Sequence, residues 1–144
     1  MRIIGGVWRS RLLTVLDSPG LRPTTDRIRE TLFNWLGQDL SGLRCLDLFA
    51  GTGALGFEAA SRGASSVVIL EKDKKAFNNL VTNFKLLQSS PVSGEIEILQ
   101  RDSLEFLKQQ ADHSSHLIFI DPPFQDEALL HSAVIEAGRI CDDA

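Results

Sequence analysis

The residues that most directly suggest a catalytic role are the four consecutive residues Asp121, Pro122, Pro123 and Phe124. They directly follow an apolar run. Proline fixes the backbone φ angle and cannot continue a helix, so two prolines hold the chain in a rigid, extended bend. The Asp121 carboxylate and the Pro122 carbonyl can then both accept hydrogen bonds from one amino group and orient its nitrogen lone pair toward a methyl donor. Phe124 offers a face on which a base can stack. The tetrapeptide therefore predicts methylation of an amino group on a planar ring, for which no metal or covalent intermediate is needed.

A glycine-rich segment from Asp47 to Gly56 contains the pattern G-x-G-x-x-G. Glycines let the backbone approach a ligand, and Glu71 lies twenty residues after Gly51, where it can accept hydrogen bonds from ribose hydroxyls. These features suit a nicotinamide dinucleotide equally well. Asp47 distinguishes the two ligands, because a carboxylate there repels a pyrophosphate but suits a cationic sulfonium and a free amino group. The segment therefore favours S-adenosylmethionine.

Asp102 admits two roles. With Glu105 three residues later it forms a helix capping box, and it can also bind the adenine amino group of the cofactor. The two roles can hold together. The full set of residues that we assign to the cofactor is Asp47, Phe49, Gly51, Gly53, Glu71, Lys72, Asp102 and Ser103.

Strand-like and helix-like segments alternate from Leu43 onward. The pattern predicts a buried strand over Cys45–Phe49 and three further strands, which are Val67–Leu70, Glu95–Gln100 and Leu117–Ile120. Such alternation implies right-handed βαβ crossovers and a parallel sheet. We therefore predict a doubly wound, Rossmann-like α/β fold in which the candidate residues meet at the carboxyl ends of the strands. Such sheets usually have five or more strands, so we expect C-terminal strands to be missing.

The N-terminal segment is basic although the chain as a whole carries a net charge of −4. Residues 1–36 hold six arginines and three acidic residues, a balance of +3, and residues 37–144 hold nine basic and sixteen acidic residues, a balance of −7. We predict an RNA-contacting arm and helix over 1–36 and a methyltransferase domain over 37–144. The arginines assigned to RNA are Arg2, Arg9, Arg11, Arg22, Arg27 and Arg29.

Within this basic segment, two β-prone runs around Gly5 and Gly6 predict a hairpin or a glycine-loosened arm. Trp8 can either pack beneath that arm or stack on RNA. A helix is predicted to begin near Thr24 or Thr25, and its apolar positions, with Trp35 expected in the core, are Ile28, Leu32, Trp35 and Leu36.

The remaining composition narrows the class of protein. Neither a secretory signal nor a disulfide framework is suggested, since Cys45 and Cys141 lie far apart and the first residues lack an apolar core. No apolar run approaches the roughly 20 residues that cross a bilayer. The three histidines show no metal-ligand spacing. We therefore expect a cytoplasmic, monomeric protein without membrane or metal partners.

Taken together, these motifs carry a resemblance to a known family. The Asp121–Phe124 tetrapeptide, the strand-turn Leu46–Gly53, the helix start Arg22–Phe33 and the opening Arg2–Gly6 resemble the bacterial 16S rRNA guanine-N2 methyltransferases that modify guanine 966. The resemblance implies that Asp47, Gly51, Gly53, Glu71 and Asp102 contact S-adenosylmethionine, that Asp121–Phe124 hold the guanine amino group, and that the basic segment binds ribosomal RNA or the assembling small subunit. It also implies a longer chain.

Other functions stay open at this point. The same chemistry could methylate adenine or cytosine in DNA, or a protein glutamine, although the arginines favour a nucleic acid. A module of this fold could also bind RNA without catalysis. A dehydrogenase is disfavoured by Asp47 and by the proline motif.

Overall fold

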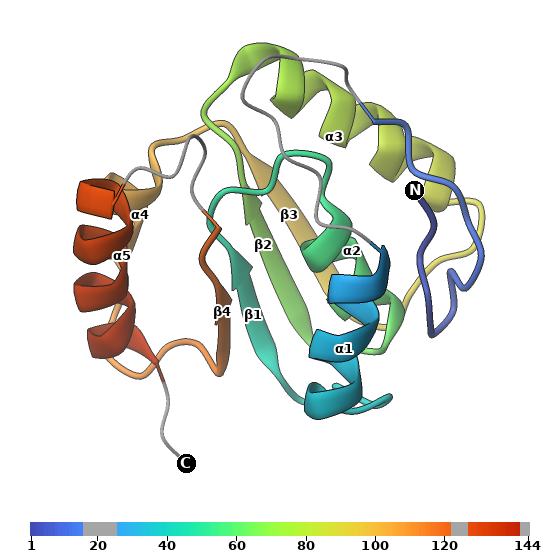
Figure 1. Ribbon diagram of the computed structural model, residues 1–144, viewed down its shortest axis with the longest axis horizontal. Coiled ribbons are helices and arrows are strands. Elements are labelled where there is room, and N and C mark those ends of the chain that lie inside the picture. The colour runs from blue at the N-terminus through green and yellow to red at the C-terminus, as the bar shows by residue number, and fades with distance from the viewer. Residues whose placement is uncertain (16–25, 122–126, 142–144) are drawn as a thin grey trace.

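The computed structural model describes residues 1–15, 26–121 and 127–141. A parallel four-stranded sheet lies at the centre of the fold (Figure 1). Its strands pair in the order β3-β2-β1-β4. The predicted doubly wound α/β fold is confirmed, and the strand bounds are β1 Arg44–Asp47, β2 Ser66–Leu70, β3 Glu95–Leu99 and β4 Leu117–Phe119.

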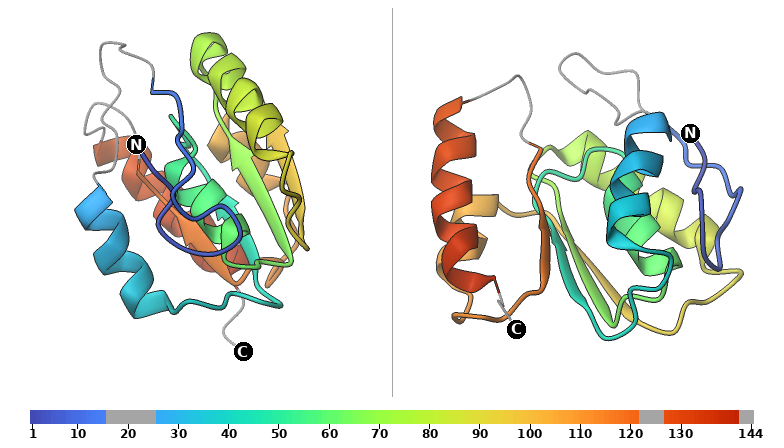
Figure 2. Two further views of the ribbon diagram at one scale, coloured as in Figure 1. Left: turned by 90° about the vertical axis from the view of Figure 1, so that its right-hand side faces the viewer. Right: turned by 60° about the horizontal axis from the view of Figure 1, so that its bottom comes forward.

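Helices cover both faces of this sheet (Figures 1 and 2). One face packs against α1 (Asp26–Leu36), α2 (Ala54–Ser61) and α3 (Lys74–Leu87). The other face packs against α4 (Ser103–Lys108) and α5 (Glu127–Ile140). Among the described residues, no helix combines the length and the apolar character that crossing a membrane requires.

Alternation along the strands explains this layering. In β2, Val67 and Ile69 join the apolar cluster under α1, α2 and α3, whereas Val68 and Leu70 pack with the cluster under α4 and α5. Successive side chains of a strand point to opposite faces, so a strand covered on both sides must be apolar throughout. The apolar run of β2 is a strand of this kind, whereas the edge strand β3 alternates the exposed Glu95 and Glu97 with half-buried apolar residues.

The N-terminal segment, predicted as a hairpin or a glycine-loosened arm, is a loop closed by antiparallel pairing of Arg2 with Leu12. Trp8 packs beneath this loop against the Phe57 ring of α2, at 6.2 Å between ring centres, and is 1% exposed; its indole N–H donates to the Ser90 carbonyl at 2.6 Å. Gly6 has a φ of +75°, and a Cβ there would lie 1.8 Å from the Ser61 carbonyl oxygen, so only glycine fits. This loop, residues 1–13, is called the arm below, and its buried side chains belong to the protein core. Of the two roles considered for Trp8, the structure shows packing beneath the arm.

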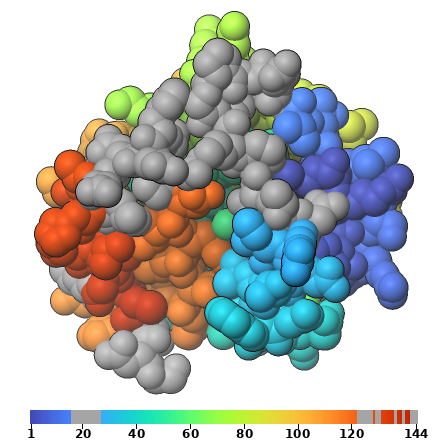
Figure 3. Space-filling view, viewed as in Figure 1, coloured from blue at the N-terminus to red at the C-terminus, as the bar shows by residue number. Residues whose placement is uncertain are grey.

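The predicted buried face of α1 is partly wrong. Trp35 is 83% exposed and Ile28 58% exposed, whereas Arg29 and Phe33 are fully buried. The buried face of α1 is rotated from the predicted one because Arg29 pairs with the buried carboxylate of Glu58. The prediction missed this because apolar periodicity alone places an arginine on the solvent-facing side of a helix. In Figure 3 the atoms of α1 lie beside those of the β4 region, where the rings of Phe33 and Phe119 pack 5.9 Å apart.

The two tryptophans provide a matched test of this packing. Trp8→Ala should lower the free energy of unfolding by about 3–5 kcal/mol, because it removes a large buried ring. Trp35→Ala should change it by less than about 0.5 kcal/mol, because this side chain faces solvent. Urea unfolding followed by circular dichroism measures both values. Equal losses in the two variants would contradict the packing described here.

Candidate functional site

Three carboxylates converge where the strand order reverses. Asp47 ends the central strand β1, Glu71 follows its neighbour β2, and Asp121 lies two residues beyond β4 on the other side. The chain runs from β1 to β2 on one side and returns to β4 on the other, and ligands of open α/β sheets bind at such a switch point. The structure therefore brings together three residues that are far apart in sequence.

Asp47 is buried beneath the glycine turn. It is 3% exposed, and its Oδ2 accepts a hydrogen bond from the Gly56 amide at 3.0 Å. Burial raises the pKa of Asp47 from 3.8 to about 7, the Gly56 hydrogen bond opposes this shift, and the negative charges of Glu71 and Asp121 add to it. The protein thus holds a carboxyl group at a position where a cationic ligand would favour its ionised form.

Glu71 holds the glycine turn in place. Its Oε1 accepts from the Gly51 amide at 2.9 Å, and its Oε2 accepts from the Asp73 amide at 2.9 Å. Gly53 has a φ of +83°, and a Cβ there would lie 2.5 Å from the Phe57 ring. Carboxylate oxygens have further lone pairs, so Glu71 can still accept from a ribose hydroxyl.

The third glycine of the pattern serves close packing. A Cβ on Gly56 would lie 2.8 Å from Ile69 Cγ1 on β2, so a larger residue would push α2 away from the sheet. Such a shift would also break the Gly56 hydrogen bond to Asp47.

Asp102 caps α4, as its sequence position predicts. Its Oδ1 accepts from the Glu105 amide at 3.0 Å, and its Oδ2 lies 3.8 Å from Lys72 Nζ. Both side chains of this ion pair are substantially exposed, so the pair adds little stability. The capping role is confirmed, and contact of Asp102 or Lys72 with adenine stays a prediction.

Two further assigned residues have structural partners. The buried Ser103 hydroxyl donates to the Leu48 carbonyl, which leaves its oxygen lone pairs and backbone for a ligand. Phe49 is half-buried and packs against the apolar cluster beneath α4 and α5. Neither arrangement tests a cofactor contact.

The proline motif is only partly described. Asp121 is exposed, whereas Pro122, Pro123 and Phe124 lie outside the described residues. Asp121 follows Phe119, which pairs with Asp47 across β1 and β4, and its negative charge adds to the rise in the pKa of Asp47. Within the described ranges, no cluster of three or more His, Cys, Asp or Glu side chains is arranged to hold a metal ion.

The arginines assigned to RNA separate into different environments. Arg2, Arg9 and Arg27 are exposed, and Arg11 is half-buried and donates to the Leu86 carbonyl at 2.6 Å. Arg22 lies outside the described residues.

Arg29 is the exception, and the prediction that it contacts RNA is wrong in this structure. Its guanidinium is 0% exposed and lies 3.2 Å from the carboxylate of Glu58. A phosphate cannot reach a side chain enclosed in this way.

Glu58 was not among the predicted site residues. It is fully buried on α2 and pairs with both Arg29 and Arg62. The available signal was a single acidic residue within the otherwise apolar and small residues of Ala54–Ser61. Nothing in the sequence pattern identified its partners, because one of them is 29 residues away.

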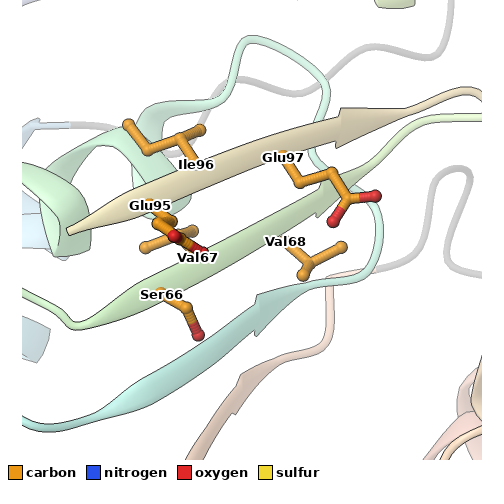
Figure 4. Close-up of a pocket in the computed structure, with 6 residues that line it drawn as sticks. All are labelled: Ser66, Val67, Val68, Glu95, Ile96 and Glu97. Carbon is orange, nitrogen blue, oxygen red and sulfur yellow. The ribbon is translucent and has the colours of Figure 1, made fainter.

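A surface hollow on the sheet does not coincide with this site. It is lined by the first three residues of β2 and of β3, including the exposed Glu95 and Glu97 (Figure 4). The carboxylates described above lie at the opposite ends of the strands.

Comparison with known proteins identifies the family. Residues 1–139 match the family described as Conserved hypothetical protein 95. The chain belongs to this family. Its match to the family model includes the glycine turn, all four strands and the Asp121–Phe124 motif.

Two curated relatives of this chain carry the name Ribosomal RNA small subunit methyltransferase D. The one from Haemophilus influenzae is 51% identical over 86% of this chain and 64% of its own length. The one from Escherichia coli K12 is 46% identical over 100% of this chain and 71% of its own length. The family resemblance seen in the sequence motifs is thereby confirmed, and this chain spans about two thirds of the length of these relatives.

A solved structure of a methyltransferase candidate, yhhF from Escherichia coli, has the same fold. It matches with a TM-score of 0.82 and 39% sequence identity, over 100% of this chain and 75% of that one. The sheet order and the helical layers described above are therefore those of a methyltransferase-like structure.

The unusual pKa of Asp47 makes protein stability depend on pH. Between 3.8 and about 7 the folded protein retains a proton on Asp47 that the unfolded chain has released. The free energy of unfolding should therefore fall as pH rises through this window, by up to about 1.4 kcal/mol per pH unit from this group.

Asp47→Asn cannot ionise and should lack this contribution. Urea unfolding of both proteins from pH 4.5 to 8 measures the difference between their stabilities. A difference that stays constant with pH would show that Asp47 does not titrate in this range.

Proposed function

We propose that the chain transfers a methyl group from S-adenosylmethionine to the exocyclic N2 amino group of a guanine in small-subunit ribosomal RNA. The observation that carries this proposal is the buried Asp47 carboxyl group, flanked by Glu71 and Asp121 at the switch point of the sheet. The names of the curated relatives support the rRNA part of the proposal.

The charge of the site selects the class of cofactor. A dinucleotide would bring a pyrophosphate toward Glu71 and Asp47, where its negative charge would oppose ionisation of Asp47, whereas a cationic ligand would favour the ionised Asp47 carboxylate. When bound, S-adenosylmethionine supplies a methyl group on a cationic sulfur, together with a free amino group. Asp47 and the turn at Gly51 and Gly53 would hold its charged part, Glu71 the ribose, and Asp102 the adenine amino group. Phe49, Lys72 and Ser103 lie on the same edge of the sheet and complete the proposed site.

Asp121 has a separate role at the exposed end of the site. Its carboxylate would accept a hydrogen bond from the target amino group and stabilise the positive charge that develops on that nitrogen. The Pro122 carbonyl would accept a second hydrogen bond, Pro123 would keep the bend rigid, and stacking on Phe124 would hold the base in the predicted arrangement.

RNA would contact the basic N-terminal segment. Arg2, Arg9, Arg11 and Arg27 are the described arginines with exposed or half-exposed side chains there, and Arg22 is assigned on its sequence position. A local excess of positive charge attracts an anionic polymer although the whole molecule is acidic. We place the reaction in the cytoplasm, on free RNA or on assembling subunits.

Labelled methyl transfer tests the whole proposal. Hypomethylated small-subunit particles, free rRNA and DNA are each incubated with the protein and labelled S-adenosylmethionine, and the products are digested to nucleosides. N2-methylguanosine from particles or rRNA is the expected product. Methylated DNA would identify another target, and RNA binding without any transfer would identify a non-catalytic module.

Cofactor binding should depend on Glu71. Glu71→Ala should weaken binding of S-adenosylmethionine by about 1–3 kcal/mol, because hydrogen bonds to a charged group are lost. Glu97→Ala is the matched control, since Glu97 is exposed in the middle of β3 and lines the surface hollow outside the proposed site. Calorimetry measures both variants, and tight binding of a nicotinamide dinucleotide by the parent protein would refute the cofactor assignment.

Asp121 should affect chemistry far more than cofactor affinity. A lost transition-state contact of about 3–4 kcal/mol corresponds to a rate reduced by about a hundred- to a thousandfold in Asp121→Ala. Asp121→Asn should be milder, because its amide oxygen still accepts a hydrogen bond. Single-turnover rates at saturating cofactor measure the effect. A near-normal rate in a folded Asp121→Ala protein would leave the catalytic assignment without support.

A further inference from the structure

A single buried carboxylate on α2 accepts hydrogen bonds from several segments. Glu58 Oε1 accepts from the Ile4 amide at 2.8 Å and from Arg29 Nη1 at 3.2 Å. Its Oε2 accepts from the Gly5 amide and from Arg62 Nε, both at 2.9 Å. A carboxylate has about four acceptor positions, so the group is saturated by partners from the arm, from α1 and from Arg62 directly after α2.

The two guanidinium groups extend this network. Arg29 Nη2 donates to the Arg2 carbonyl at 2.6 Å, which joins α1 to the arm. The Arg62 guanidinium lies 4.8 Å from the centre of the Phe33 ring and donates to the Gly37 carbonyl at 3.3 Å, just beyond the end of α1. The arm and α1 are therefore attached to the C-terminal half of α2, where Figure 2 shows the three segments packed side by side.

The other half of α2 belongs to the cofactor site. The helix begins directly after the turn at Gly51–Gly53, and its Gly56 amide donates to Asp47. Helices rise about 1.5 Å per residue, so the start of α2 and Glu58 are separated by only about one turn. A hydrogen bond from Thr52 Oγ1 to Met1 Sδ, at 3.6 Å, brings the start of the arm to the same turn.

We propose that Glu58 and Arg29 form a positioning site that holds the basic arm and α1 in a fixed place relative to the methyl-donor turn. Arg29 then acts on RNA binding through its contacts with Glu58 and Arg2, whereas the exposed Arg27 on the same helix meets RNA directly. This inference rests on the proposed function, because one of its tests measures RNA binding.

The variant Arg29→Met tests the positioning role with little disturbance of buried charge. It leaves Glu58 paired with Arg62, so one buried carboxylate still faces one buried guanidinium. We expect RNA affinity to fall at least fivefold, while cofactor affinity and the single-turnover rate at saturating RNA stay within threefold of the parent values. The salt slope of RNA binding should not change, because no phosphate contact is removed.

Arg27→Met is the matched control on the same helix. It removes an exposed guanidinium and should reduce the salt slope by about 0.7 to 0.9 for a lost phosphate contact. Arg29→Lys keeps a cation opposite Glu58 and should restore most of the RNA affinity. An unchanged affinity in Arg29→Met, or a salt slope reduced as in Arg27→Met, would overturn the proposal.

Hydrogen exchange examines the attachment without RNA. Arg29→Met should speed exchange of the Ile4 and Gly5 amides at least tenfold and leave the Phe77 amide of α3 unchanged. If the parent protein neither binds nor methylates RNA, the proposed function fails, and this measurement alone decides the positioning role. Full protection of Ile4 and Gly5 in the variant would show that Arg29 does not hold the arm.

Discussion

The arrangement of the N-terminal third depends on the burial of one charged group, the carboxylate of Glu58. Removing a carboxylate from water is costly, and the cost is offset here by two guanidinium groups and two backbone amides. Each of those partners comes with its own segment, so satisfying the charge also brings the arm, α1 and the end of α2 together. The rotated face of α1, with Arg29 inside and Trp35 outside, follows from this requirement.

The second buried carboxylate, that of Asp47 at the end of β1, has the opposite kind of surroundings. Asp47 receives one amide hydrogen bond and lies near two other acidic residues, so burial and repulsion raise its pKa toward neutrality. Glu58 has two arginines as counter-ions, whereas no basic side chain of residues 1–15, 26–121 or 127–141 forms an ion pair with Asp47. The two buried carboxylates are thus distinguished by their partners, although both accept hydrogen bonds from α2 or from the residue that follows it.

The strand order explains why the predicted residues meet. Asp47, Glu71 and Asp121 are separated by tens of residues, and parallel pairing in the order β3-β2-β1-β4 puts the ends of their strands at one edge. The two crossovers from β1 to β2 and from β2 to β3 run one way, and the return to β4 on the far side of β1 opens the switch point. Glycine at positions 53 and 56 allows the turn and α2 to pack closely, since a Cβ on Gly53 would meet Phe57 and a Cβ on Gly56 would meet Ile69.

The sequence by itself determined the elements, the fold class and the residues at the strand ends. Strands covered on both faces must be apolar throughout, capping residues such as Asp102 mark helix starts, and glycine patterns mark turns with positive φ. These signals depend on residues that are close together in the sequence, so they can be recognised without the structure. The tertiary structure alone decided that Arg29 is buried, that Trp35 is exposed, that Trp8 packs in the core against Phe57 and that Glu58 joins three segments. Those outcomes depend on which charges and rings come together across long separations, because the cost of burying a group is set by its partners and not by its type.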